Sequence, residues 1–142
     1  MQTLLIAVDG SPFSERALDY ALGRVAASRE PLQLRLLNVQ LPLAGVNVKL
    51  FISKESQQNY HREEAMAVLE PSRQRALAAG IACEHHIGVG DPGGTIAEYA
   101  RSLGCDEVVM GTHGRGFLAG AVMGSVAQKV VNLAPVPVVL VK

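Results

Sequence analysis

Glycine is concentrated between residues 110 and 129, where the sequence reads MGTHGRGFLAGAVMGSVAQK. Gly111 and Gly114 follow an apolar run, and Gly124 and Ser125 precede a segment whose apolar residues have helical spacing. Ordering glycine costs more backbone entropy than ordering any other residue. We therefore expect that the function or packing of this segment requires backbone without side chains. Free N–H groups at a helix start attract phosphate when no side chain blocks the approach. The stretch therefore predicts a phosphate cradle with two glycine-containing walls.

The same stretch also fits a purely structural loop. Ser125 and Gln128 form the S-x-x-Q pattern of a helix capping box, and glycines often serve only to make turns. On glycine count alone, a structural loop explains the stretch about as well as a phosphate site does. No Lys lies between Gly111 and Gln128, so this is not a P-loop, and no G-x-G-x-x-G follows the first apolar run.

Asp9 is the second candidate, at the end of the apolar run in LLIAVDGSP. Asp before Gly is common in turns, so Asp9 is either a turn former or a ligand-binding carboxylate. Ser11 is the expected N-cap of the next helix, and Pro12 suits its first position. Ligands of parallel α/β sheets bind beyond the carboxyl ends of the strands, where both Asp9 and the glycine stretch lie.

No other group of residues predicts catalysis or metal binding. The sequence shows no Ser–His–Asp or Cys–His set, and we expect no catalytic residue and no metal site. His85 and His86 are adjacent in an expected strand, so they point to opposite faces and do not share an ion. Cys83 and Cys105 are too far apart for a CxxC motif and are interpreted as reduced, buried residues.

Short aliphatic segments alternate with helical patterns along the chain. Alternation of this kind is typical of a parallel sheet with right-handed crossovers and helices on both faces. The helix after residue 55 contains Pro71, where we expect a kink or a restart. The expected strands are residues 3–8, 32–39, 82–89, 107–110 and 136–141, and the expected later helices are 55–79, 96–103 and 122–133.

Length and composition narrow the class of protein. The 142 residues suit one domain spanning 1–142, with 49% apolar residues, no Trp and an aliphatic core. Thirteen basic and thirteen acidic residues cancel, so no basic stripe indicates nucleic acid. The N-terminus has no basic region, and its apolar stretch is too short for a signal peptide or a membrane span. We expect a cytoplasmic protein without membrane or nucleic-acid partners.

The spacing G-x2-G-x9-G-[ST] matches Gly111, Gly114, Gly124 and Ser125, and resembles the nucleotide-binding motif of the universal stress protein family. The resemblance extends over nearly the whole chain. It includes LLIAVDGSPFSERALDYAL, LLNV, GDPGGTIAEYA, DEVVMGTHGRG and GSVAQKVVNLAPVPVVLV, in that order. It implies a five-stranded parallel sheet of order 3-2-1-4-5, a homodimer and membership of the ATP-binding branch.

The resemblance also assigns residues to the site. It places Asp9 near the adenosine, with Ala7 two residues before it, and gives the Val39 backbone to adenine recognition. The phosphate-binding positions that it implies are Gly111, Thr112, His113, Gly114, Arg115, Gly124, Ser125 and Val126. Family members often carry a basic residue shortly before the last G-[ST], where this chain has FLAGAVM. The implied cofactor is ATP, with Mg²⁺ through the phosphates, and AMP or ADP remain alternatives.

Three functions are compatible with the sequence. The one we favour is an ATP-binding regulatory module, a homodimeric switch with a protein partner that the sequence does not identify. One alternative is an enzyme, either a slow ATPase or a nucleotide-dependent transferase. The other is a protein-binding dimer that does not use nucleotide.

The last apolar segment predicts how the dimer forms. In the implied order 3-2-1-4-5, Val136–Val141 lies at an edge of the sheet. Pro135 and Pro137 protect only its entry, and the segment carries no charge. Pairing with the same strand of a second subunit would remove this edge. Tolerance of a short edge, or cover by the preceding helix, is the alternative.

Overall fold

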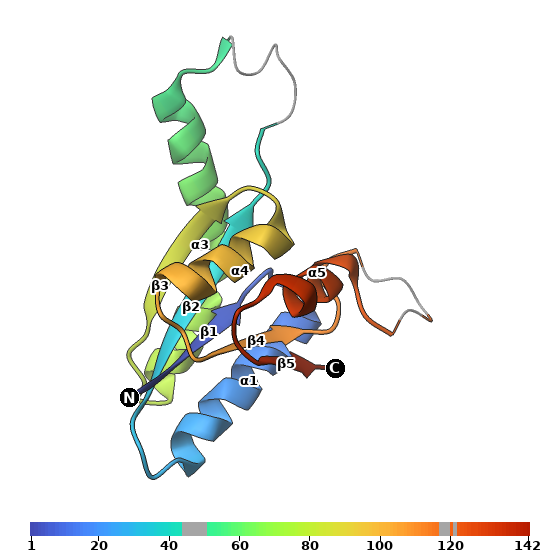
Figure 1. Ribbon diagram of the computed structural model, residues 1–142. Coiled ribbons are helices and arrows are strands. Elements are labelled where there is room, and N and C mark those ends of the chain that lie inside the picture. Colours follow the sequence, from blue (N-terminus) through green and yellow to red (C-terminus); the bar gives the residue numbers. More distant parts are fainter. Residues whose placement is uncertain (44–50, 117–119, 121) are drawn as a thin grey trace.

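A five-stranded, wholly parallel sheet forms the centre of the computed structural model, which describes residues 1–43, 51–116, 120 and 122–142. The strand order is β3-β2-β1-β4-β5, as the sequence resemblance implied (Figure 1). The strands are β1 (Gln2–Ala7), β2 (Leu32–Gln40), β3 (Glu84–Val89), β4 (Glu107–Gly111) and β5 (Val138–Val141). β1 therefore lies in the middle, between β2 and β4, with β5 at one edge.

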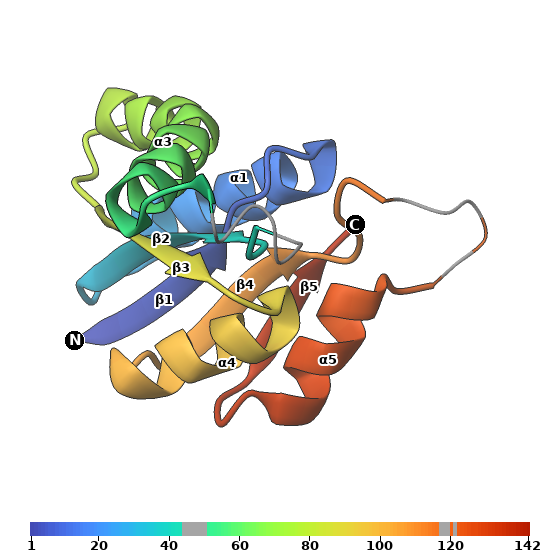
Figure 2. The same ribbon diagram turned by 90° about the horizontal axis from the view of Figure 1, so that it is seen from above.

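Helices cover both faces of the sheet (Figure 2). The helices are α1 (Pro12–Ala27), α3 (Lys54–Ala78), α4 (Pro92–Ser102) and α5 (Ser125–Leu133). α1 and α3 pack on one face around Leu4, Ile6 and Leu69, and α4 and α5 pack on the other around Leu5, Val108 and Val130. Alternate residues of each strand thus enter different cores, which is why the strands are apolar on both sides.

Side-chain caps start α1 and α4, and the cap of α1 is at the residue that the sequence predicted. The Ser11 hydroxyl accepts from the Ser14 N–H at 3.2 Å, and Pro12 occupies the first turn of α1. Asp91 caps α4 in the same way, because its Oδ2 accepts from the Gly94 N–H at 3.0 Å. Both caps satisfy first-turn N–H groups that have no partner within the helix.

Several expected boundaries differ from the observed ones, among them the starts of α4, at Pro92 rather than at residue 96, and of β3, at Glu84 rather than at residue 82. α3 continues through Pro71 as one helix, so of the expected kink or restart the restart does not occur. α5 begins at Ser125 rather than at Val122, since Gly124 is extended (φ −74°, ψ 165°) and forms the N-cap. Val136 and Pro137 precede β5, which starts at Val138.

The two cysteines lie on opposite sides of the sheet. Cys83 packs with the core under α1 and α3, and Cys105 is buried in the core under α4 and α5. Both thiols are free, and burial raises the pKa of each. No helix in the described part of the chain is long and apolar enough to cross a membrane.

Candidate functional site

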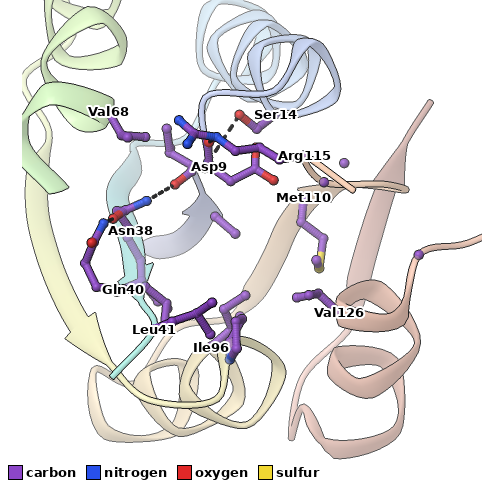
Figure 3. Close-up of a pocket in the computed structure, with 18 of the residues that line it drawn as sticks. Asp9, Ser14, Asn38, Gln40, Leu41, Val68, Ile96, Met110, Arg115 and Val126 are labelled. Atoms are coloured by element: carbon purple, nitrogen blue, oxygen red, sulfur yellow. Dashed lines mark hydrogen bonds between the residues drawn. The ribbon is translucent and has the colours of Figure 1, made fainter. Parts of the chain in front are cut away.

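A cavity of about 590 Å³ opens at the carboxyl ends of β1, β2 and β4 (Figure 3). α3, α4 and α5 contribute to its walls through Tyr60, Ile96 and Val126. The residues expected at the site that line it are Ala7, Asp9, Val39, Gly111, His113, Gly114, Arg115, Gly124, Ser125 and Val126. Thr112 does not line the cavity. The fold thus brings together segments from both halves of the chain.

Asp9 organises the turn between β1 and α1. Its Oδ1 accepts from the Ser11 N–H at 2.8 Å, which makes it the turn former that the sequence allowed. Its backbone N–H donates to the Ser14 hydroxyl at 3.4 Å. Asp9 also lines the cavity, so shaping the turn and facing a ligand are not exclusive roles.

Arg115 folds back onto this turn. Its Nε donates to the carbonyl oxygen of Asp9 at 2.7 Å, and its guanidinium lies against Gly10. This position ties the glycine stretch to the end of β1. Figure 3 shows Arg115 beside Asp9, across the cavity from Leu41 and Ile96.

Close packing within the protein explains why two positions of the motif are glycine. A Cβ at Gly111 would lie 2.5 Å from the Cβ of Phe13 and 2.9 Å from its backbone carbon. A Cβ at Gly114 would lie 2.7 Å from Oδ2 of Asp9. Bare backbone at these positions therefore lets α1 and Asp9 approach the glycine stretch, a purpose that the phosphate interpretation did not include.

The start of α5 leaves hydrogen-bond donors facing the cavity. The Gly124 N–H donates to the Thr112 carbonyl at 2.7 Å and is thus occupied. Ser125 does not cap the helix through its side chain, so the capping-box interpretation is wrong. The first-turn N–H groups of Val126 and Ala127 find no acceptor among the described residues, and both residues line the cavity. With the helix dipole, they favour an anion.

Contacts of Thr112 and His113 with β5 and α1 support the glycine stretch. Thr112 is buried, and its N–H donates to the carbonyl of Val141 in β5 at 2.9 Å. Its hydroxyl lies 3.0 Å from His113 Nδ1, and the His113 ring packs 5.2 Å from that of Phe13. Thr112 thus supports the cavity wall rather than forming it.

A pair of amide side chains, one buried and one half-buried, is a part of the site that the sequence analysis missed. Asn38 Nδ2 donates to the Val8 carbonyl at 2.7 Å, and Gln40 Nε2 donates to Asn38 Oδ1 at 2.6 Å. Asn38 is buried and lines the cavity. It stands in the otherwise apolar segment LLNV, and a polar residue at a strand's carboxyl end was the available signal.

The cavity has an apolar side and a polar side. Figure 3 shows Asp9 and Arg115 together on one side of the cavity and Leu41 and Ile96 on the other, with Met110 and Val126 of α5 beside each other between them. Among the described residues, no three His, Cys, Asp or Glu side chains are placed to hold a metal ion. A site of this kind suits a ligand that is flat and apolar at one end and anionic at the other.

Comparison with known proteins gives matches along the whole chain. The universal stress protein family matches residues 1–142. A universal stress protein of Thermus aquaticus is 30% identical over 146 residues, covering 99% of this chain and 98% of that protein. The solved structure of MJ0577, a universal stress protein of Methanocaldococcus jannaschii, has a TM-score of 0.82 at 26% identity, with 99% and 95% of the two chains covered. A universal stress protein solved in complex with cAMP has a TM-score of 0.71 at 29% identity, with 99% and 97% covered.

Proposed function

The chain belongs to the universal stress protein family, and we propose that it is a regulatory module that binds an adenine nucleotide in the cavity described above. The observation that carries the proposal is the juxtaposition of an apolar side with the free first-turn N–H groups of α5 in one cavity. The similar protein solved with cAMP supports an adenine nucleotide as the ligand.

Strand order suggests how the nucleotide lies. β1 separates β2 from β4, so the carboxyl ends of β2 and β4 are two strand spacings apart, about 10 Å. We place the base at the end of β2, beside the Val39 backbone, and the ribose at the end of β1, beside Asp9. The phosphates then reach the end of β4 and the start of α5.

The cations near the site favour short phosphate chains. Arg115 is bound to the Asp9 carbonyl, and Lys129 in α5 pairs with Asp91 at 2.7 Å, which lowers the pKa of that carboxyl. Charge neutralisation of a triphosphate would then depend on Mg²⁺ carried by the nucleotide. We therefore propose that AMP and ADP bind about as well as ATP.

We further propose that two chains pair through β5. This strand is at the edge of the sheet, and its four valine and leucine side chains are only half-buried. Its end is hydrogen-bonded to the glycine stretch behind the site, because the Val141 carbonyl accepts from the Thr112 N–H at 2.9 Å. Pairing at β5 and nucleotide binding would thus affect each other, as a regulatory switch requires.

The experiment that tests nucleotide binding is calorimetry with AMP, ATP and adenosine on wild type and on Ser125→Asp. An acidic residue in the first turn suits a helix, so this variant should fold as well as wild type. Its carboxylate would repel phosphate at the cavity wall. We expect AMP and ATP to bind more than about tenfold more weakly, and adenosine to bind equally well.

Ser125→Asn is the matched control, because it is nearly isosteric with Ser125→Asp and uncharged. It should keep most of the affinity for AMP. Wild type that binds none of the three ligands would contradict the proposed function. An equal loss for adenosine and AMP in Ser125→Asp would contradict the placement of the phosphates.

A further inference from the structure

An aromatic side chain that the family motif does not include stands at the mouth of the cavity. Tyr60, in the first half of α3, lines the cavity and is 47% exposed. Neither of the other two tyrosines, Tyr20 and Tyr99, lines it. No described residue hydrogen-bonds the Tyr60 hydroxyl, and the ring of the neighbouring His61 meets it edge-on, at 5.6 Å between centroids. One face of Tyr60 is therefore available to a ligand.

His61 holds this part of α3 in place. Its side chain is buried, at 9% exposure, directly after the exposed tyrosine. Consecutive helical residues point about 100° apart, so a buried His61 directs Tyr60 toward the rim rather than into the core. Tyr60 thus has a fixed backbone and a free ring.

Aliphatic side chains line the same cavity. Leu41 and Pro42 follow β2, and Ile96 comes from α4 on the other side of the sheet. Leu41 is 67% exposed, so its side chain presents apolar surface that a ligand in the cavity can cover. An aromatic ring and an aliphatic surface around one opening fit a flat, unsaturated ring.

Resting on the nucleotide binding proposed above, we propose that Tyr60 stacks on the base and is a specificity-determining residue for nucleobases. Tyr60 belongs to α3, which packs against β2, and the base is placed at the end of β2. Stacking is tolerant of base identity because every base has a π face. Tyr60 therefore favours nucleotides over sugar phosphates, without itself distinguishing adenine from guanine.

The test compares AMP with ribose 5-phosphate by calorimetry on wild type, Tyr60→Ala and Tyr60→Phe. Stacking of a partly exposed ring predicts that Tyr60→Ala binds AMP roughly five- to tenfold more weakly. Ribose 5-phosphate should bind all three proteins equally. Tyr60→Phe should bind AMP like wild type, because it keeps the ring.

Tyr20→Ala is the matched control, since Tyr20 is also a half-exposed helical tyrosine, at 41%, and lies outside the cavity. It should not change AMP affinity. Should Tyr60→Ala fail to fold, Tyr60→Leu keeps the apolar contact and helix propensity while removing the π face. It should show the same selective loss.

Tyrosine fluorescence gives an independent readout, because the chain has no Trp. AMP should change the emission of wild type and leave that of Tyr60→Phe unchanged. Unaltered AMP affinity in Tyr60→Ala and Tyr60→Leu, with wild type binding, would overturn the stacking role alone. Absence of AMP binding in wild type would instead overturn the proposed function on which it rests.

Discussion

The carboxylate of Asp9 occupies the space that a Cβ at Gly114 would need, with Oδ2 only 2.7 Å from that position. Oδ1 of the same carboxylate accepts from the Ser11 N–H. Gly114 thus allows Asp9 to complete the turn that precedes α1. A variant at Gly114 acts on Asp9 first, and any effect on a ligand follows from that.

Gly114→Ala should therefore displace the Asp9 carboxylate and lose its bond to Ser11. We expect a cost of about 1 kcal/mol in the free energy of unfolding, the usual net value of one hydrogen bond. In an Asp9→Ala background the same change should cost much less, because the conflict is gone. Urea unfolding of the four proteins measures this coupling, and additive costs would contradict it.

Gly111→Ala should destabilise the protein more than Gly114→Ala does. Its Cβ would meet the Cβ and backbone carbon of Phe13, which the first turn of α1 holds in place. Overpacking against backbone costs about 1–3 kcal/mol. The control is Gly116→Ala, since nothing lies within 4 Å of a Cβ there. Equal unfolding midpoints for Gly111→Ala and Gly116→Ala would show that α1 yields readily.

Charge in β5 should separate the proposed dimer. Val139→Lys places an ammonium group in the edge strand, where pairing of two copies would bring two of them close together. Light scattering should give twice 15.1 kDa for wild type and a lower mass for the variant. Val131→Lys, at an exposed position of α5, should remain dimeric. A wild-type mass of 15.1 kDa at micromolar concentration would exclude the β5 interface.

His86 should make stability depend on pH. Burial, followed by the nearby Arg35 guanidinium, lowers the pKa of His86 below its ordinary value of 6.5. Arg35 NH1 lies 3.2 Å from His86 Nε2, which accepts a hydrogen bond only when unprotonated. As pH falls below 6.5, the unfolded chain takes up the proton before the folded protein does, and stability is lost.

His86→Gln removes this titration and keeps an acceptor for Arg35. Between about pH 7.5 and about pH 5.5, its unfolding midpoint in urea should fall less than that of wild type. An equal fall for wild type and His86→Gln would contradict the prediction.

Local patterns were sufficient to predict the class of fold. Strand and helix periods depend on neighbouring residues, so the alternation of elements, the Ser11 cap and the helix start at Pro12 were all readable from the chain. The order 3-2-1-4-5 came from resemblance rather than from pattern. The spacing of glycines also indicated which two segments would meet at the site, since strand ends in a parallel sheet share one edge.

Contacts between distant segments determined the rest. Gly111 and Gly114 are bare because Phe13 and Asp9 approach them, and neither neighbour is evident from spacing. α5 begins at Ser125 rather than at Val122 because the Gly124 N–H donates to the Thr112 carbonyl. In the sequence, Tyr60 is one residue of a charged helix and has no feature that indicates binding. In the structure, α3 lies beside the end of β2, and Tyr60 therefore lines the cavity. Sequence periodicity records which face of an element is buried, whereas a binding surface depends on what other elements place opposite that face.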